Sequence, residues 1–419
     1  MPQMPAPTPG NTEWFVQDRF GLFIHWGLHA LPARHEWVKM REEIPDEKYQ
    51  TYFKHFDPDL YDPTVWAKAA ADAGMKYFVI TSKHHEGFCL WDSALTDYKS
   101  TNTPCGIDLL EPMVEAFRAE GIKVGFYHSL LDWHHPDFPV DGIHPQRNDK
   151  AFRDRTKNRD VSKYAEYLYG QSVELMERFD PDIMWYDFSY SGHEDAGKGR
   201  KDWASERIIA KLRDMKPEII INDRLEIDQD IKTPEQIQPG EWPTVNGKPV
   251  IWEACQTLNG SWGYDRDNMD WKPVDMLVRM LVDGVSKGGN LLLNVGPTGR
   301  GEFDERTLAT LQGIGEWTKR HGRSIYGCTA SDLEAPANCR YTQNGNRLYL
   351  HTFTWPMKHI RVKGLAGKVE YAQLLNDASE VHIHTELHGE KAGDDEIILQ
   401  LPIQKPNVAV PVIELFLKE

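Results

Sequence analysis

The chain has 419 residues, of which 40% are hydrophobic and 14 are tryptophan, so it can build one large core and a smaller second domain. Its formal net charge of −16 argues against nucleic acid and anionic membrane surfaces as partners. The Pro-rich start MPQMPAPTPG has no apolar signal segment, no stretch is long enough to span a membrane, and five scattered cysteines form no CxxC. We therefore expect a cytoplasmic protein with reduced thiols.

Apolar runs of strand type alternate with helical patterns over about the first 330 residues. Such alternation is typical of βα units, and seven strands favour a closed (β/α)8-like barrel over an open sheet. The predicted strands are Asp18–Gly27, Lys76–Ser82, Ile122–Ser129, Asp182–Asp187, Glu218–Asp223, Pro249–Ala254 and Gly289–Val295. The predicted helices are Thr64–Ala73, Leu109–Ala119, Tyr164–Arg178, Glu206–Met215 and Asp304–Arg320.

Short alternating strands separated by turn residues follow the last of these helices. This pattern predicts an antiparallel β-sandwich, with a catalytic barrel over residues 1–330 and the sandwich over 331–419. Its predicted strands are Arg347–Phe353, His359–Val362, Glu370–Leu374, Glu396–Leu401 and Val410–Phe416. His382 and His384 form an HxH there, which we expect to face solvent rather than a metal.

The stretch Pro181–Tyr190 carries the first functional signal. Its apolar strand ends on the carboxylate of Asp187, two residues after Trp185, and turn-prone serines follow. In a (β/α)8 barrel the carboxyl ends of the strands carry the chemistry, so Asp187 is a candidate nucleophile or base. An Asp that only caps the next turn would look the same in isolation.

Polar and aromatic clusters also follow five other predicted strands. Six such strand ends are hard to explain by packing alone. Tryptophan rings pack on the C–H patches of a sugar, and His, Arg and Glu side chains bind its hydroxyl groups. Two carboxylates act on the glycosidic bond. The pattern therefore indicates carbohydrate chemistry. The clusters contain His25, Glu36 and Trp37; His84 and His85; Tyr127 and His128; Arg224; and Trp262.

A metal site would be another explanation of the histidines. His84 and His85 are adjacent, so on a strand they would point to opposite sides and could not both bind one ion without a turn between them. The first strand also lacks the HxH expected of a barrel metallohydrolase. We therefore expect no metal and no cofactor.

Several motifs together resemble glycoside hydrolase family 29, the α-L-fucosidases. They span the whole barrel in the order of that family, and the Gly-rich run is the most specific; it lacks the GK[ST] of a phosphate loop. The motifs are HWG at 25–27, KHHEGF at 83–88, WYD at 185–187, NDR at 222–224, SWGY at 261–264 and KGGNLLLNVGPTGRG at 287–301.

The resemblance implies a retaining exo-α-L-fucosidase that releases L-fucose through a covalent fucosyl-enzyme. By similarity Asp187 is the nucleophile, and the substrate is a small or oligosaccharide fucoside. The implied fucose pocket contains His25, Glu36, Trp37, His84, His85, Trp185, Arg224 and Trp262, with either Tyr127 or His128 touching the sugar.

The general acid/base is assigned by the same resemblance. Glu235 follows the NDR motif at a separation like that in the family, which makes it the preferred residue, while Glu241 and Glu253 stay open. Glu253 is expected to end a strand.

Two other functions fit the same residues. One is another retaining specificity on the same barrel, such as α-L-galactoside cleavage, because one ring substituent separates the two sugars. The other is a fucose-binding protein that does not cleave, which the presence of both carboxylates disfavours. Linkage preference and oligomeric state are not predicted.

Overall fold

Seven parallel strands form one curved sheet in the computed structural model, which describes residues 4–193 and 198–418. The sheet order is β5-β4-β3-β2-β1-β9-β8. The strands are β1 (Phe20–Ile24), β2 (Tyr77–Lys83), β3 (Lys123–Ser129), β4 (Ile183–Asp187), β5 (Ile220–Ile221), β8 (Glu253–Thr257) and β9 (Asn290–Val295). Nearly every strand residue is buried, as expected for strands covered on both faces.

An irregular parallel segment, residues 230–236, fills the gap between β5 and β8. On one side Ile231 bridges Asn222, just after β5, and on the other Glu235 bridges Cys255 of β8. The segment donates backbone hydrogen bonds from Asp230 to Ile221 (3.0 Å) and from Lys232 to Ile251 (2.9 Å). The ring therefore has eight members, and the predicted barrel is confirmed with an eighth strand that periodicity did not reveal.

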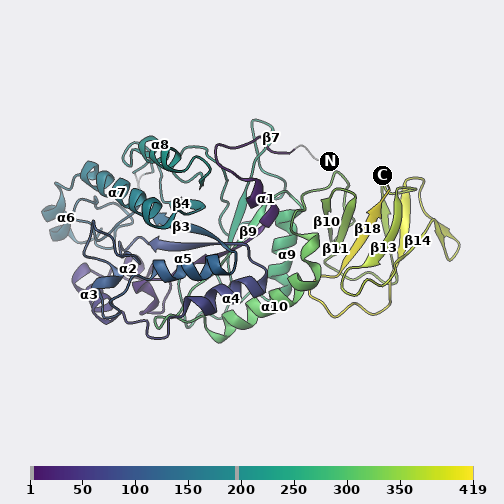
Figure 1. The fold of residues 1–419 in the computed structure, drawn as a ribbon, viewed down its shortest axis with the longest axis horizontal. Coiled ribbons are helices and arrows are strands. Elements are labelled where there is room, and N and C mark those ends of the chain that lie inside the picture. Colours follow the sequence, from purple (N-terminus) through teal and green to yellow (C-terminus); the bar gives the residue numbers. More distant parts are fainter. Residues whose placement is uncertain (1–3, 194–197, 419) are drawn as a thin grey trace.

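Helices cover the outside of this ring (Figure 1). Those between successive strands are α4 (Pro63–Ala73), α5 (Leu110–Ala119), α7 (Val161–Phe179), α8 (Ser205–Met215) and α9 (Val274–Val285), and α10 (Glu305–His321) follows β9. Asp62, Asp160 and Asp304 begin three of them by accepting hydrogen bonds from backbone N–H groups of the first turn. Helix α9 was not predicted.

Shorter elements lie in the connections. They are α1 (Glu13–Asp18), α2 (Val38–Arg41), α3 (Asp46–His55), α6 (Lys150–Thr156), the 3-10 turns η1 (Leu28–Ala30), η2 (Ser100–Asn102) and η3 (Gly322–Ser324), and the hairpin of β6 (Thr244–Val245) and β7 (Lys248–Pro249). No helix among residues 4–193 and 198–418 is both long and apolar enough to cross a membrane.

Strand alternation sorts side chains between the lumen of the barrel and the layer under the helices. In β4, Ile183 and Trp185 join the lumen core, whereas Met184 and Tyr186 join the core beneath the helices. The same alternation places Phe23 of β1 in the lumen and Ile24 outside it. Asp187, two residues after Trp185, therefore lies on the lumen side of its strand, at the carboxyl end.

The C-terminal region consists of two antiparallel sheets with a core of their own. One has the order β10-β11-β18-β13 and the other β12-β17-β14. The strands are β10 (Cys339–Asn344), β11 (Arg347–Thr352), β12 (His359–Lys363), β13 (Val369–Leu374), β14 (His382–His384), β17 (Glu396–Gln400) and β18 (Val412–Leu417), with a hairpin of β15 (Glu386–Leu387) and β16 (Glu390–Lys391). The predicted sandwich is confirmed, with β10 added to the predicted strands and His382–His384 forming an edge strand.

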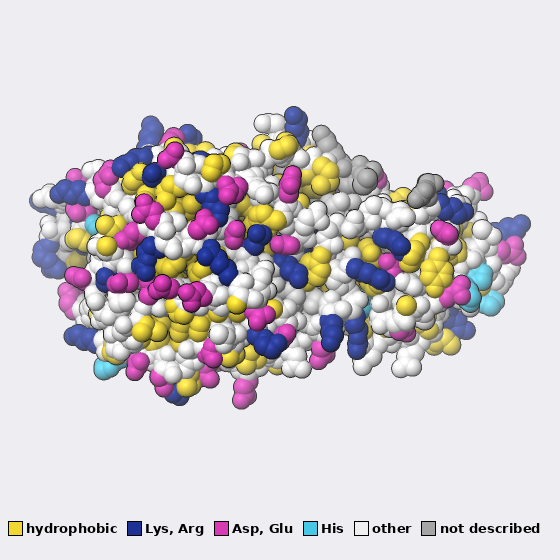
Figure 2. Space-filling model, in the orientation of Figure 1, with side chains coloured by type: hydrophobic (Ala, Val, Ile, Leu, Met, Phe, Trp, Pro, Cys, Tyr) yellow, Lys and Arg dark blue, Asp and Glu magenta, His cyan; other side chains and the backbone are white. Residues whose placement is uncertain are grey.

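Charged side chains of both signs are interspersed over the face shown in Figure 2. The excess of acid is thus spread among basic residues on this face rather than gathered in one block.

Candidate active site

The carboxyl ends of the barrel strands surround a hollow of about 300 Å³. Aromatic rings form most of its wall, and two carboxylates and one guanidinium supply its charge. The lining residues are Phe23, His25, Trp37, His84, His85, Tyr127, Trp185, Asp187, Phe188, Arg224, Glu235, Cys255 and Trp262. Ten of the residues predicted for the site are therefore brought together here from seven parts of the chain.

Asp187 ends β4 and is held from two sides. Its Oδ2 accepts a hydrogen bond from the Tyr127 hydroxyl at 2.8 Å, and its Oδ1 accepts one from Arg224 Nη1 at 2.7 Å. Burial, and then the Asp187 charge, raise the pKa of Tyr127 well above its ordinary value, so this hydroxyl stays a donor. Both carboxylate oxygens are fixed in orientation.

Arg224 binds both carboxylates through one nitrogen. Nη1 donates to Asp187 Oδ1 at 2.7 Å and to Glu235 Oε2 at 2.8 Å, so these oxygens are no further apart than the sum of the two distances, 5.5 Å. Carboxyl groups about 5 to 5.5 Å apart are typical of retaining glycosidases, whereas inverting enzymes keep about 6.5 to 9.5 Å for a water. The spacing favours nucleophilic attack by a carboxylate.

The guanidinium of Arg224 is itself held in place. Its Nε and Nη2 donate to the Thr233 hydroxyl (3.1 Å) and carbonyl (3.0 Å), and its Cζ lies 4.5 Å from the centre of the Trp185 ring. Burial lowers the pKa of Arg224, but the charge of Asp187, with that of Glu235, raises it well above its ordinary value overall. Arg224 is a permanent positive charge in the site.

Glu235 lies at the end of the irregular strand 230–236. Its side chain is 43% exposed, against 9% for Asp187, so one carboxylate is deep and the other faces solvent. A nucleophile at the bottom and a solvent-facing proton donor at the rim would meet opposite sides of one glycosidic bond.

Three non-glycine residues with a left-handed backbone lie next to carboxylates in or near the site. His35, Phe188 and Gln236 have φ of 62°, 73° and 55°, in the left-handed region that residues with a side chain avoid. They adjoin Glu36, Asp187 and Glu235. At Phe188 this conformation turns the chain away from the strand direction, and the ring packs on His85 with centroids 4.6 Å apart.

His84 and His85 both line the pocket, because they lie after the end of β2 rather than on it. Strand β2 ends at Lys83, so the two residues lie in the turn that follows, and their ring centroids are 4.0 Å apart. Opposite orientation holds only for adjacent residues on a strand, and both the predicted and the observed strand end before His84.

Glu86 lies between His84 and His29. Its Oε1 is 3.4 Å from His29 Nδ1, and its Oε2 is 3.3 Å from His84 Nδ1. Burial opposes the charged forms, yet the interaction with Glu86 raises the pKa of His29, and the two histidines lower the pKa of Glu86 well below its ordinary value. Of the described residues, only these three have donor atoms close enough together to hold a metal ion, within 4.8 Å of one another.

Two predicted pocket residues are placed elsewhere. His128 is on the outer face of β3, because Tyr127 takes the inner face; its Nδ1 is 3.0 Å from the Ser82 hydroxyl and it is fully buried. Glu36 is behind Trp262 rather than in the lining, since its Oε2 accepts hydrogen bonds from the backbone N–H groups of Trp262 (3.1 Å) and Gly263 (2.7 Å).

The alternative acid/base residues do not line the pocket either. Glu253 begins β8 instead of ending a strand, because the observed strand runs three residues further than predicted. It is buried at the opposite end of the lumen, where it accepts a hydrogen bond from the Tyr77 hydroxyl. Glu241 is exposed on the connection before β6.

Sequence reasoning missed Phe23, Phe188 and Cys255 in the lining. Phe23 lies two residues before His25 on the same strand face, so strand period alone could have identified it. Cys255 became visible only once the bounds of β8 were known, and Phe188 depends on its left-handed backbone.

Comparison with known proteins gives one family. The family model described as Alpha-L-fucosidase matches residues 7–323. Plasma alpha-L-fucosidase of Homo sapiens is 32% identical over 343 residues, covering 75% of this chain and 68% of that protein. Tissue alpha-L-fucosidase of Bos taurus is 30% identical over 377 residues, covering 82% and 75%.

Solved structures agree with this result. Alpha-L-fucosidase isoenzyme 1 from Paenibacillus thiaminolyticus has a TM-score of 0.92 and 46% identity, covering 97% of this chain and 99% of that one. A family 29 alpha-L-fucosidase from Bacteroides thetaiotaomicron, trapped as a covalent intermediate with 2-fluoro-fucosyl fluoride, has a TM-score of 0.84 and 28% identity, covering all of both chains.

Proposed function

The chain belongs to the α-L-fucosidase family of glycoside hydrolases, and we propose that it is a retaining exo-α-L-fucosidase acting by double displacement through a fucosyl-enzyme. The observation that carries this proposal is the single nitrogen of Arg224 that bonds both Asp187 and Glu235. It limits the separation of the two carboxylates to the range that retaining enzymes use. The trapped intermediate of the Bacteroides thetaiotaomicron relative supports the same mechanism.

The first chemical step uses the two carboxylates in different roles. Asp187 Oδ attacks the anomeric carbon and forms an ester bond as the glycosidic C–O bond breaks, while Glu235 as a carboxylic acid gives its proton to the departing oxygen. In the second step the Glu235 carboxylate takes a proton from a water, whose oxygen attacks the same carbon. Fucose leaves in the α form, and the Asp187 carboxylate and the Glu235 acid are restored.

The neighbours of Asp187 prepare it for attack. Tyr127 and Arg224 each donate to a different oxygen of the carboxylate, which fixes its orientation and stabilises the charge that returns to it when the ester is cleaved. Hydrogen bonds to a charged group are worth about 1.5 to 3 kcal/mol each, so both interactions matter to the rate.

The wall of the pocket suits one terminal sugar. Trp37, Trp185 and Trp262 offer apolar ring surface, and His25, His84 and His85 offer ring nitrogens for hydroxyl groups. The hollow of about 300 Å³ ends in the closed lumen, which supports an exo mode of attack.

Activity on aryl α-L-fucoside and aryl α-L-galactoside, measured side by side, tests the proposal. We expect cleavage of the fucoside, with α-fucose as the first product in proton NMR. Preferential cleavage of the galactoside would support the related specificity. Cleavage of neither substrate would support a binding protein, and first release of β-fucose would support an inverting mechanism.

Variants separate the two carboxylates. Glu235→Ala should lose about 10² to 10⁴-fold on an oligosaccharide and far less on a dinitrophenyl fucoside, because that leaving group needs no proton, and azide should restore turnover. Asp187→Ala should be inactive on both substrates. Glu241→Ala is the matched control and should behave as wild type. If it shows the azide-rescued profile instead, the acid/base role moves to Glu241.

A further inference from the structure

His25 is fixed in the pocket wall by a side chain from β9. Its Nδ1 lies 2.7 Å from Asn294 Oδ1, and Asn294 Nδ2 lies 2.7 Å from the backbone carbonyl oxygen of Trp262. Asn294 is on the lumen face of β9, where it is 1% exposed. The carboxamide therefore links two residues that line the pocket while not lining it itself.

The hydrogen-bond partners of Asn294 determine which atom of its carboxamide is the oxygen and which is the nitrogen. A carbonyl oxygen can only accept, so the atom facing Trp262 O is the NH₂ group and the atom facing His25 is the oxygen. An amide oxygen can only accept in turn, so His25 Nδ1 carries the proton. In a neutral ring this leaves a lone pair on Nε2, the nitrogen at the far side of the ring from Asn294.

His85 has the same arrangement through a different partner. The Ser129 hydroxyl donates to the Leu131 carbonyl at 2.9 Å, so its oxygen accepts from His85 Nδ1 at 2.7 Å. Burial, followed by the neighbouring histidine charge, holds the pKa of both His25 and His85 well below the ordinary value, which keeps both rings neutral.

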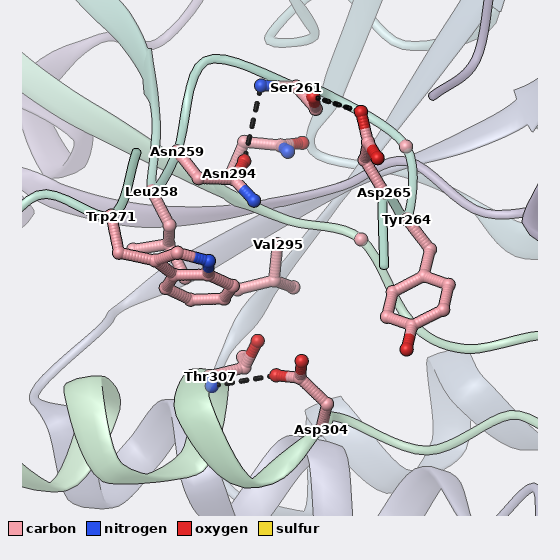
Figure 3. A pocket seen from close by; sticks show the side chains of 12 residues that line it. Leu258, Asn259, Ser261, Tyr264, Asp265, Trp271, Asn294, Val295, Asp304 and Thr307 are labelled. Carbon is pink, nitrogen blue, oxygen red and sulfur yellow. Dashed lines mark hydrogen bonds between the residues drawn. The ribbon is translucent and has the colours of Figure 1, made fainter. Parts of the chain in front are cut away.

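Asn294 also helps to hold Trp262 from behind. Glu36 Oε2 binds the N–H of Trp262 and Asn294 Nδ2 binds its carbonyl, so both sides of this residue's backbone are fixed. Figure 3 shows Asn294 beneath the 258–265 loop, in the wall of a second, smaller pocket that Asn259 and Ser261 also line. The end of β9 packs closely on the loop: a Cβ at Gly296 would come within 2.5 Å of the Tyr264 nitrogen.

We propose that Asn294 is a positioning residue that fixes the Nδ1–H tautomer of His25, so that His25 accepts a hydrogen bond from a sugar hydroxyl, and that holds Trp262 against the same sugar. The inference deepens the proposed function and rests on it. A residue that only filled space at this position would leave the ring free to carry its proton on either nitrogen.

Several charged or titratable groups face His25 and enter any test by pH. From the turn after β2 these are His84 and Glu86, from η1 His29, and from β3 Tyr127, whose ring centroid is 5.4 Å from that of His25. None of these side chains is replaced in Asn294→Asp, but the introduced carboxylate also titrates, so the ionisation of His25 is read from its own ring ¹⁵N signals.

The tautomer is measured without substrate. A long-range ¹H–¹⁵N NMR spectrum of histidine-labelled protein distinguishes protonated from unprotonated ring nitrogens, and the His25 signals are those lost in His25→Asn. We expect Nδ1 protonated and Nε2 unprotonated at neutral pH. A proton on Nε2 would overturn the inference whether or not the enzyme turns over fucosides.

The kinetic test is Asn294→Asp. The carboxylate still accepts from Nδ1 but favours the imidazolium, which cannot accept from a hydroxyl. Relative to wild type, kcat/KM on an aryl α-L-fucoside should fall by more than about tenfold between pH 8 and pH 5.5. Asn259→Asp, an amide-to-acid change in the neighbouring cavity, is the matched control and should keep the wild-type profile.

Three results separate the possible failures. A pH profile of Asn294→Asp that has the wild-type shape would overturn the inference while leaving the proposed function intact. Absence of turnover in the wild type would overturn the proposed function. If Asn294→Asp does not fold, Asn294→Ala replaces it, and a kcat/KM within about twofold of wild type would then exclude a positioning role.

Discussion

Arg224 is the residue on which the geometry of the site depends most. Its guanidinium donates from Nε and Nη2 to Thr233 and from Nη1 to the carboxylates of Asp187 and Glu235. One planar cation therefore holds side chains of β4 and of the irregular strand. A guanidinium suits this task because its donors have fixed directions, whereas an ammonium is a point charge.

Arg224→Lys should therefore be far from conservative. One ammonium group cannot reach Thr233 and both carboxylates in the same geometry, so kcat/KM should fall more than about tenfold with thermal stability little changed. Arg207→Lys, in an exposed pair with Glu166, is the control and should have no effect. Equal kinetics for the two variants would remove Arg224 from the reaction.

The burial of Glu253 predicts how the free energy of unfolding depends on pH. Burial raises its pKa from 4.5 to about 7, although the hydrogen bond from Tyr77 partly opposes the shift. Between these two values the unfolded chain has lost the proton that the folded chain keeps, so the free energy of unfolding falls as pH rises and levels off above about pH 7.

The side chain of the isosteric variant Glu253→Gln cannot ionise, so this contribution to the fall in the free energy of unfolding with rising pH should be absent. Between pH 5 and pH 8, wild type should lose about 2 kcal/mol relative to the variant, measured by urea unfolding at both pH values. Parallel pH dependence of the two proteins would show that the carboxyl group is ionised in the fold throughout.

At the residue scale, strand period identifies the side chains that face the lumen wherever the predicted strand bounds are right. His25, Tyr127, Trp185 and Asp187 are on inner faces that alternation identifies. Alternation also decides between Tyr127 and His128, which the resemblance left open, because only one of two adjacent strand residues can face the lumen. Glu253 was misplaced because the predicted strand ended three residues too early, which moved its side chain to the other end of the lumen. Glu36 illustrates a different limit, because its hydrogen bonds to a loop more than two hundred residues away leave no local pattern.

At the scale of elements, the irregular strand 230–236 is the least predictable and functionally the most important. It has no run of strand-forming residues, since Lys232, Thr233 and Pro234 interrupt any period, and it exists because β5 and β8 offer unpaired edges on both sides. By closing the ring it delivers Glu235 to the rim beside Asp187.

Asp230 anchors the start of this strand. Its Oδ1 accepts from the backbone N–H of Gly10 at 2.6 Å, and its Oδ2 accepts from the N–H of Ile221 at 2.7 Å and pairs with Arg213. The carboxylate is 2% exposed, so its loss would leave buried donors without a partner.

Asp230→Ala should accordingly lower the free energy of unfolding by about 3 kcal/mol or more and reduce kcat, because Glu235 loses its support. Asp228→Ala is the matched control: its side chain is 68% exposed and forms a surface ion pair with Lys232, so a change below about 1 kcal/mol is expected. Chemical denaturation and steady-state kinetics measure both. A stable Asp230→Ala enzyme with normal kcat would mean that the strand is held without this carboxylate.

At the scale of the whole molecule, the sandwich is packed against the barrel through α9 and α10, which lie between the two in Figure 1. Val410 and Val412 belong to the same apolar core as the barrel helices. Trp317 of α10 donates its indole N–H to the Val410 carbonyl at 2.8 Å, and Arg340 binds Asp283 of α9 at 2.8 Å. An interface that continues the core in this way is unlike the polar surfaces between independently moving domains.

The continuity of the core predicts that barrel and sandwich unfold together. Leu399→Ala, in the core of the sandwich and away from the pocket, removes a fully buried side chain and should cost about 2 to 5 kcal/mol. The sandwich supports α9 and α10, so two temperatures should fall together in this variant. One is the temperature at which fucosidase activity is lost, and the other is the unfolding temperature of the sandwich strands, measured by hydrogen exchange. Met357→Ala, at an 86% exposed position of the same region, should change neither temperature. If activity persists in Leu399→Ala to the wild-type temperature while the sandwich strands exchange earlier, the barrel is stable by itself and the shared core contributes little to it.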